Sequence, residues 1–340
     1  MPTNRRQFVK RTALGGTVGI SSVIAGCMGG DDDTELQVGI VDPLTEPVSL
    51  FEIDEIADAV GENMGSEYDL TVNAAEGSPQ VINQLSAGEL QIGNVAYASF
   101  PQSISQEAVP GGLTGIVTEA RDAHPDYKPW EILTLEDSDI SEPEDLEGAE
   151  FGVNAVGTGV HAICELGLEE FGLDPDEDVE WVEIEFPAIG SALRDGRIDA
   201  GIFVPIFAHA EEAEGGVELV FDSTDVWDEQ YDFTFLAARN EFLDGNEDVV
   251  EYFLEDYVNL LEYIYDDDNR DDVVSLVSEE FDIPEDLLDL YYLTEEDFYR
   301  PQDGRLDIPR LQEVVDRLVE SEFIDEGITV DDHVTNEYLP

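Results

Sequence analysis

The chain has 340 residues, of which 82 are acidic and 14 are basic, and its formal net charge at pH 7 is −68. This length suggests two domains, and the hydrophobic residues, 42% of the chain in ordered runs, argue against a disordered acidic protein. Direct binding to nucleic acid is also disfavoured, because the sequence has no basic patch that could release phosphate counterions.

The charge also indicates the environment of the protein. Four basic residues and no acidic residue precede Cys27, so the rest of the chain has 10 basic against 82 acidic residues, or −72. In dilute salt this like charge opposes a compact state, whereas multimolar salt shortens the Debye length to roughly 3 Å or less. We therefore expect that this is a protein of a halophile and that it folds at high salt concentration.

The first residues have the pattern of an export signal. Arg5 and Arg6 precede a mostly apolar run, and this arrangement resembles a twin-arginine signal. The run has about 15 residues, whereas roughly 20 are needed to span a bilayer, which argues against a transmembrane anchor. We expect 1–26 to be a twin-arginine lipoprotein signal peptide and 27–34 to be a flexible tether.

The two cysteines are expected to have different roles. Ile24-Ala25-Gly26-Cys27 resembles a lipobox, in which the cysteine becomes the lipid-bearing first residue of the mature chain. Cys164 lies at an apolar position of a predicted helix, so we expect it to be buried rather than nucleophilic, and we expect no disulfide. The mature protein should then sit on the outer face of the cell membrane, held by its lipid.

Strands and helices alternate in the next part of the chain. Apolar periodicity predicts strands at 36–41, 68–75 and 90–95, and helices at 48–64 and 79–87. Alternation of this kind predicts a parallel sheet with helices on both faces. Ligands of such sheets bind beyond the carboxyl ends of the strands.

The loops after these three strands carry candidate ligand-binding residues. Leu44 and Thr45 follow the first strand, Ser78 follows the second, and Tyr97 follows the third. Hydroxyl groups and one aromatic ring near helix starts suit the wall of a pocket. The alternative is that Thr45 and Ser78 only cap helices, which is the usual role of such residues.

A second αβ unit follows an irregular stretch at 121–129. The predicted strands lie at 111–120, 130–135, around 151, 181–184, 198–204, 217–221 and 232–238, with helices after Gly159, at 188–194 and after Pro205. The remainder, about 241–319, is predicted to be helical with tyrosine-rich faces. The unit therefore repeats the organisation of the first.

The stretch between the strand at Phe151 and the helix that ends at Phe171 is the strongest single candidate for a binding loop. Gly157, Thr158, Gly159 and Val160 join the two elements, so backbone N–H groups are free at a helix start. Such a turn can hold an anion or a polar head group. The alternative is that the glycines only allow the turn from strand to helix.

Neither catalysis nor metal binding is expected. The four histidines are scattered, and no Gly-x-Ser-x-Gly or His-Glu-x-x-His motif occurs, so His161 is interpreted as a helix residue rather than a catalyst. Asp267, Asn269 and Asp271 begin like a calcium loop, but Asp272 stands where glycine is required. We expect no cofactor and no metal.

Several motifs, in the order in which they occur, resemble the solute-binding proteins of nitrate, sulfonate and taurine ABC importers, whose superfamily includes binders of the thiamine pyrimidine precursor. The resemblance is clear over about 35–240 and loose in the helical C-terminal part. Gln91 departs from the acidic residue that this family often has before its Ile-Gly pair. The segments that carry the resemblance are Ala87-Gly88-Glu89-Leu90-Gln91-Ile92-Gly93, Leu146-Glu147-Gly148-Ala149-Glu150-Phe151-Gly152-Val153, Gly157-Thr158-Gly159, 172–179, Ala192-Leu193-Arg194-Asp195-Gly196 and Ile198-Asp199-Ala200.

The resemblance implies an α/β, type 2 periplasmic-binding-protein fold, with two αβ lobes around a ligand cleft and two crossover strands. Lobe 1 would comprise 35–116 and 228–340, lobe 2 would comprise 117–227, and the crossings would lie near 114–119 and 223–232. The loops named above would then face one cleft, together with Phe203 and Pro205 at the end of a strand in lobe 2.

The resemblance also implies a binding function that involves no catalysed reaction. A ligand that contacts both lobes would shift an open ensemble toward a closed form that an ABC permease recognises. We expect a monomer that delivers a small organic or anionic solute of the sulfonate, nitrate or taurine class. A binder or enzyme for a pyrimidine or another heterocyclic precursor is the alternative, and a surface protein without a small ligand is a third possibility. No lysine occurs in the expected cleft, and Tyr97, Phe186, Phe203 and Tyr231 would suit a flat organic molecule.

Overall fold

A computed structural model describes residues 34–340 of the chain. The expected signal peptide, the expected lipid site Cys27 and nearly all of the expected tether lie outside these residues. Within 34–340, no helix combines the length and the apolar character that crossing a membrane requires.

The first sheet, sheet A, has the strand order β2-β1-β3-β10-β4. Its inner strands are largely buried on both faces, as strands covered by helices on both sides should be; all five residues of β3 are buried. β1 pairs in parallel with β2 and β3, whereas β10 is antiparallel to both β3 and β4. The strands are β1 (Thr34–Ile40), β2 (Tyr68–Ala74), β3 (Ile92–Ala96), β4 (Leu113–Asp122) and β10 (Tyr231–Arg239).

The second sheet, sheet B, has the order β7-β6-β8-β5-β9. β6 is parallel to β7 and β8, and β5 is antiparallel to β8 and β9. The parallel pairing expected for the strands at 36–41, 68–75 and 90–95 is confirmed, and each complete sheet is mixed because it also contains antiparallel strands. The chain enters sheet B through β5 and returns to sheet A through β10. β5 is antiparallel to β8, and β10 is antiparallel to β3. The strands are β5 (Glu131–Leu135), β6 (Ala149–Val153), β7 (Val179–Glu183), β8 (Ala200–Phe203) and β9 (Val217–Asp222).

The helix expected at 48–64 is instead two short elements. Ile53 has an extended backbone with φ −87° and ψ 109°, which separates a 3-10 turn from the α-helix that follows and ends at Gly61. The Ile53 side chain is buried, so this break turns an apolar residue into the core. The helical elements of the described chain are η1 (Pro47–Glu52), α1 (Asp54–Val60), α2 (Ser78–Ala87), α3 (Ser99–Ser105), η2 (Pro143–Leu146), α4 (Gly159–Glu170), α5 (Phe186–Arg194), α6 (Pro205–Glu214), α7 (Ser223–Val226), α8 (Asn240–Leu243), α9 (Glu247–Ile264), α10 (Arg270–Phe281), α11 (Glu285–Tyr291), α12 (Ile308–Glu320) and η3 (Val330–Asp332).

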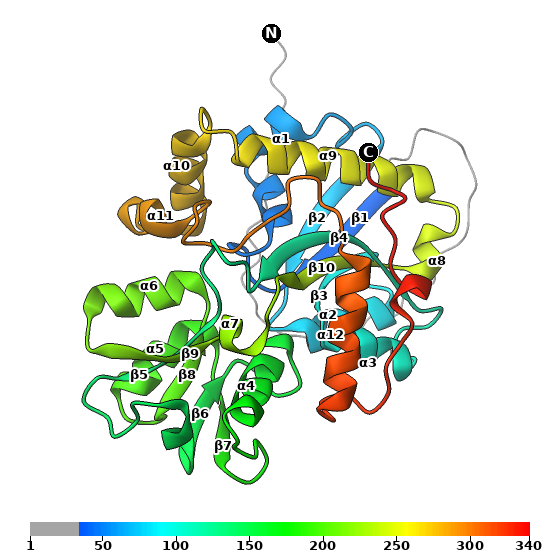
Figure 1. The fold of residues 1–340 in the computed structure, drawn as a ribbon. Coiled ribbons are helices and arrows are strands. Elements are labelled where there is room, and N and C mark those ends of the chain that lie inside the picture. The colour runs from blue at the N-terminus through cyan, green and yellow to red at the C-terminus, as the bar shows by residue number, and fades with distance from the viewer. Residues whose placement is uncertain (1–33) are drawn as a thin grey trace, which may run out of the picture. The chain divides into compact units, whose positions relative to one another are not determined.

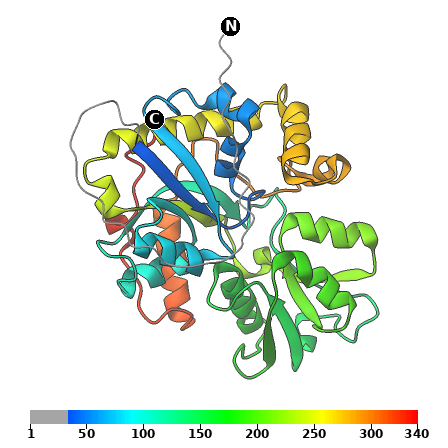
Figure 2. The same ribbon diagram turned by 180° about the vertical axis from the view of Figure 1, so that it is seen from behind.

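Each sheet has its own helical cover. α9 packs against α1 and β2, α2 and α3 pack against β3, and α12 packs against β10, as Figure 1 shows. α5 and α6 cover sheet B and enclose a small separate core that contains Leu133, Ile189 and Phe203. From behind, the green elements of sheet B again lie apart from the blue and cyan elements of sheet A (Figure 2).

The chain passes between the sheets twice. β4 remains in sheet A as far as Asp122, so the first passage is 123–130, and the second is 223–230. We expected the lobe boundary at residue 116. The segment 114–119 is instead paired with β10 as part of β4, so the first passage begins only after Asp122.

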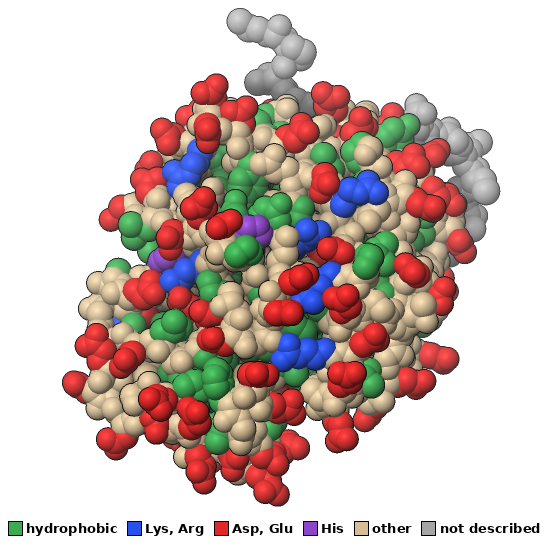
Figure 3. Space-filling model, in the orientation of Figure 1, with side chains coloured by type: hydrophobic (Ala, Val, Ile, Leu, Met, Phe, Trp, Pro, Cys, Tyr) green, Lys and Arg blue, Asp and Glu red, His purple; other side chains and the backbone are tan. Residues whose placement is uncertain are grey.

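Acidic side chains are spread over the whole face drawn in Figure 3, whereas Lys and Arg form only a few spots on it. Helix surfaces illustrate the pattern, because α9 begins with Glu247 and Asp248 and has no basic residue in its last turn. Exposed carboxylates are thus a general property of this surface, so an acidic patch on it does not by itself identify a site.

Candidate ligand-binding site

One buried carboxylate ties the two passages together. Asp122, at the end of β4, accepts hydrogen bonds from the Ser223 hydroxyl at 2.7 Å and the Tyr231 hydroxyl at 3.0 Å. The Trp130 backbone N–H, at the end of the first passage, also donates to it at 3.4 Å. Burial raises the pKa of Asp122 to about 6. Since these partners come from both passages, Asp122 holds the two connections side by side.

A small cavity lies between the two sheets, next to this junction. Its volume is about 50 Å³, which is room for roughly three to five water-sized groups. The wall on the sheet A side consists of loop and strand-end residues of that sheet: Val41, Asp42, Thr45, Glu46, Gly77, Ser78, Asn94, Ala96, Phe233 and Thr234. The opposite wall and the floor are formed by Trp130, Asn154, Thr158, Gly159, Val160 and Phe186.

Five of the candidate residues from the sequence line this cavity: Thr45, Ser78, Thr158, Gly159 and Val160. The Thr158 side chain also caps α4 by accepting from the His161 backbone N–H at 3.4 Å, so the loop turns sharply into the helix as expected. Ser78 is the first residue of α2, and no side chain caps the start of that helix. The sequence therefore located loops from both sheets at the same cavity.

The other five candidates lie elsewhere. Tyr97 is fully buried and donates its hydroxyl to the Gly159 carbonyl at 3.0 Å, so it joins the two loops from behind the cavity wall. Phe203 points into the core beneath α5 and α6. Leu44 is half-buried outside the lining, Pro205 is a buried first residue of α6, and Gly157 borders a different pocket.

The ionisable residues of the lining, Asp42 and Glu46, are both acidic. Glu46 is buried and accepts from the Val41 backbone N–H at 2.7 Å. Burial, reinforced by nearby Glu119, raises the pKa of Glu46 well above its usual range. Behind the wall, the Asn94 side-chain amide donates to Glu119 at 2.6 Å, and burial raises the pKa of Glu119 to about 8. Two carboxyl groups are therefore held without full charge beside the cavity at neutral pH.

Three buried polar atoms of the lining have no hydrogen-bond partner among the described residues. These are Asn94 Oδ1, Thr234 Oγ1 and the indole Nε1 of Trp130. Asn94 is fully buried and Thr234 is 6% exposed. A buried acceptor without a partner is costly, so such atoms in a cavity wall indicate that something else binds to them.

The nearest buried cation is already matched. Arg300 donates to Asp297 at 2.8 Å and to the Thr45 carbonyl at 3.1 and 3.2 Å. It therefore supports the backbone of the Thr45 loop and does not itself line the cavity. Sequence reasoning missed Arg300, because it lies some 255 positions from Thr45 in the chain, in the segment where the family resemblance is loose.

Three aromatic rings complete the wall. The Trp130 ring lies 5.1 Å from that of Phe233 and 5.6 Å from that of Phe186, measured between centroids. A groove of about 540 Å³ shares Val41, Gly77, Asn154 and Phe186 with the cavity and leads outward between the loops of the two sheets. The cavity is thus the inner end of a longer depression.

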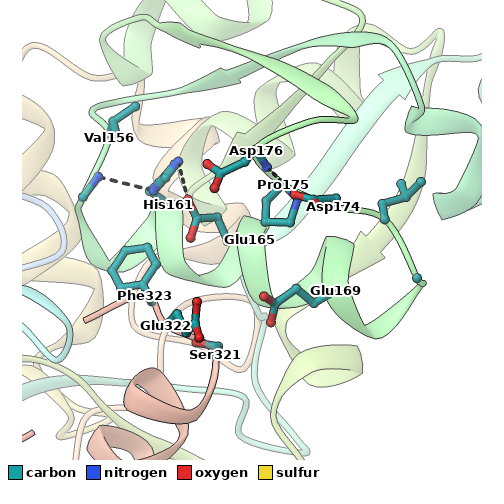
Figure 4. Close-up of a pocket in the computed structure, with 13 residues that line it drawn as sticks. Val156, His161, Glu165, Glu169, Asp174, Pro175, Asp176, Ser321, Glu322 and Phe323 are labelled. Atoms are coloured by element: carbon teal, nitrogen blue, oxygen red, sulfur yellow. Dashed lines mark hydrogen bonds and ion pairs between the residues drawn. The ribbon is translucent and has the colours of Figure 1, made fainter. Parts of the chain in front are cut away.

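A larger pocket of about 750 Å³ lies on the other side of the 154–160 loop and is drawn in Figure 4. His161 accepts from the Gly157 backbone N–H at 3.3 Å and lies 3.3 Å from Glu165, as the dashed lines mark. Burial lowers the pKa of His161 to about 4 and raises that of Glu165 to about 7. His161 therefore faces Phe323 and acidic side chains, and it does not line the cavity between the sheets.

Comparisons with known proteins agree with this architecture. Residues 123–270 match the family model described as "NMT1/THI5 like". No curated protein matches the chain. The alkanesulfonate-binding protein SsuA from Xanthomonas axonopodis pv. citri, solved bound to MOPS, has a TM-score of 0.71 at 15% identity, covering 90% of this chain and 99% of its own.

Two further solved structures show the range of this fold. The periplasmic nitrate-binding protein NrtA from Synechocystis PCC 6803 has a TM-score of 0.67 at 10% identity, over 90% of this chain and 87% of its own. The desulfurization enzyme DSZB has a TM-score of 0.61 at 16% identity, over 89% and 97%. The resemblance seen in the sequence is confirmed, and the fold is the two-lobed periplasmic-binding-protein fold. One enzyme among these structures means that the fold alone does not separate binding from catalysis.

Proposed function

We propose that this chain is an extracytoplasmic solute-binding protein that captures a small molecule between its two lobes and delivers it to an ABC importer. The observation that carries the proposal is the cavity itself, because loops of both sheets form its wall and buried polar atoms in that wall lack partners. A solute there would contact both lobes at once. It would therefore favour the closed arrangement over an open one.

The contact between Tyr97 and Gly159 supports closure as the mechanism. Gly159 begins α4 beside sheet B, whereas Tyr97 follows β3 of sheet A, and the two meet at the cavity wall. A Cβ at position 159 would lie 2.9 Å from the Ala96 Cβ and 3.1 Å from the Tyr97 ring. Glycine at this position therefore allows the two loops to approach.

The proposed partners follow from the same account. A permease would recognise the closed form, and Cys27, outside the described residues, would carry a lipid that keeps the protein at the outer face of the membrane. Cys27→Ser should then release the protein from the membrane fraction; equal retention of both forms would contradict the lipid anchor. We propose a monomer, with lobes formed by the segments of sheets A and B.

A second candidate function is catalysis on a related solute. It is favoured by one observation, the similarity to the desulfurization enzyme DSZB. His161 and Cys164 do not line the cavity, and burial raises the pKa of the Cys164 thiol well above its usual range. These features favour binding. Chromatography of each bound compound before and after incubation separates the two functions, because a binding protein returns it unchanged.

The test of solute binding is a thermal-shift screen in multimolar KCl, followed by calorimetry. The panel comprises sulfonates, nitrate, taurine, pyrimidines and small amines. Gly159→Ala should lower the affinity of any hit at least about tenfold, because the added Cβ opposes closure.

Gly327→Ala is the matched control. Its Cβ would meet Val319 at 3.0 Å, a similar steric contact, but far along the chain from the cavity lining. This variant should bind as the wild type does. Equal affinity of the Gly159→Ala variant and the wild type would remove the cavity as the solute site.

A further inference from the structure

The charge of the cavity wall distinguishes classes of solute. Asp42 and Glu46 line it, and among the residues described no Lys, Arg or His does. Glu46 is buried and Asp42 is half-buried, unlike the acidic residues that cover the surface (Figure 3). The general acidity of the chain explains the surface but does not explain a carboxyl group at a buried wall, where Glu46 keeps its proton unless a cation offsets the cost of its charge.

The unpartnered atoms indicate the same class. Asn94 Oδ1 is an acceptor only, because the Asn94 amide already donates to Glu119, and Thr234 Oγ1 has an oxygen available to accept. Glu46 adds its Oε1, because only its Oε2 accepts from the Val41 N–H, so the unmatched acceptors outnumber the one unmatched donor, Trp130 Nε1. The natural complement of this wall is a group with several N–H donors.

The aromatic rings add a second, independent preference. Trp130, Phe186 and Phe233 all line the cavity, and the Trp130 ring lies next to each of the other two. The faces of such rings attract cations, and guanidinium groups stack on them particularly well. An oxyanion would meet these same faces and the carboxylates without a cation in the wall to balance its charge.

A bare metal ion does not fit as well. Within residues 34–340, no three His, Cys, Asp or Glu side chains are grouped so that they could hold a metal. An organic cation uses the aromatic wall and the acceptors together, and the volume of about 50 Å³ accommodates a small head group. The acidic groove outside, with Glu76, Glu183 and Glu185, could hold a longer tail.

We propose that the solute of this cavity is a small organic cation with N–H donors, such as a guanidinium, amidinium or ammonium group, rather than a sulfonate or nitrate. This inference rests on the proposed function, since it assigns a class of solute to the same site. The cationic head lies against Trp130 and donates to Glu46 and Asn94.

Three probes of nearly equal size and different charge test the assignment. Methylguanidinium, methylurea and methanesulfonate carry charges of plus one, zero and minus one, and none changes its charge between pH 5 and 9. Calorimetry in multimolar KCl at pH 9, above the pKa of about 8 of Glu119, should show methylguanidinium binding at least about tenfold more tightly than methylurea, with no binding of methanesulfonate. Salt weakens this preference less than it weakens surface attraction, because the carboxylates are buried.

Two variants connect the preference to named residues. Glu46→Gln keeps an oxygen that can accept from the Val41 N–H, so it should fold, and it should reduce the advantage of methylguanidinium over methylurea about tenfold. Glu89→Gln, an exposed carboxylate of the same sheet region, is the control and should change nothing. Phe186→Ala is a second, half-buried change that should lower affinity for methylguanidinium more than for methylurea.

The outcomes separate this assignment from the proposed function. Tighter binding of methanesulfonate or nitrate, weakened by Gly159→Ala, would overturn the cation assignment and leave solute binding in the cavity intact. Methylguanidinium binding that Gly159→Ala and Glu46→Gln leave unchanged would overturn both. Failure of methylguanidinium and methylammonium to bind at all would also overturn the cation assignment.

Discussion

The cavity between the sheets and the His161 pocket share one loop, 154–160, but have opposite character. The His161 pocket is the larger by far, about 750 Å³ against 50 Å³, yet its carboxylates, such as Glu169 and Glu322, are at least partly in solvent. The small cavity contains three aromatic rings and three buried polar atoms without partners, against one such atom, His161 Nε2, in the His161 pocket. In a chain this acidic, volume and negative charge are poor signs of a site, and buried unmatched groups are better ones.

The largest expected effect concerns the exposed carboxylates of the surface, of the kind that border the His161 pocket. Lowering KCl from molar to tens of millimolar should unfold the protein, because the repulsion within a chain of net charge −68 is no longer screened. Near-ultraviolet circular dichroism measures the loss of tertiary structure. A melting temperature that stays constant over this range would contradict the dependence on salt.

A matched pair of phenylalanines sharpens the comparison of the two regions. Phe186 borders the cavity and Phe323 borders the His161 pocket, and both are half-buried. Phe186→Ala and Phe323→Ala should each cost about 1–3 kcal/mol of stability in chemical unfolding, less than a fully buried ring. Only Phe186→Ala should weaken solute binding, by about tenfold or more. The reverse pattern would move the site to the His161 pocket.

The pH dependence of binding should follow the buried carboxyl pair. Burial raises the pKa of Glu119 to about 8, so it is protonated below that pH and must lose its proton to favour a cation nearby. Affinity for methylguanidinium should therefore increase as pH rises from 6 to 9, and calorimetry should show proton release. The ionisable groups that face Glu46 and Glu119 are Asp42, Arg300 and Tyr257, and Asp297 pairs with Arg300. An affinity that falls over this range would indicate an anionic solute.

Glu119 also leads to a prediction for the stability of the protein without solute. This stability should fall with rising pH, whereas the affinity for methylguanidinium should rise. Between the ordinary pKa of a glutamate, near 4.5, and about 8, the folded state retains a proton on Glu119 that the unfolded chain releases. The free energy of unfolding should therefore fall as pH rises through this window. Glu119→Gln should flatten the dependence, and a dependence unchanged by this variant would place the titration elsewhere.

A smaller effect is expected at the contact between the loops. Tyr97→Phe removes the hydroxyl that donates to the Gly159 carbonyl and keeps the ring packing against Trp227 and Tyr231. It should weaken solute binding by roughly 0.5–1.5 kcal/mol, because the bond joins the two lobes in the closed form. A loss of stability with no change in calorimetric affinity would show that this bond does not contribute to closure.

The sequence predicted the order of strands and helices well, because apolar periodicity is local. Strand ends of one sheet share an edge, which predicted that the loops at Thr45 and Ser78 would lie together, and the family resemblance predicted that 158–160 of the other sheet would face them. The sequence misplaced Phe203 because alternate strand residues face opposite sides, and only packing shows which side faces α5 and α6.

Other parts of the site depend on contacts that no local pattern contains. Phe233 and Thr234 reach the cavity because β10 inserts between β3 and β4, more than a hundred residues away in the chain. Trp130 was expected to begin a strand and is instead the residue just before β5, and the strand pattern does not show that its ring faces the cavity. The unpaired state of Asn94 is a property of its neighbours in space, so only the folded structure reveals it.

The most direct measurement is a crystal structure grown in multimolar KCl with methylguanidinium. The account predicts density for the planar cation in the small cavity, against the Trp130 ring and within hydrogen-bond distance of Glu46 and Asn94. Density for the cation in the His161 pocket, or an anion bound in the cavity in its place, would contradict it.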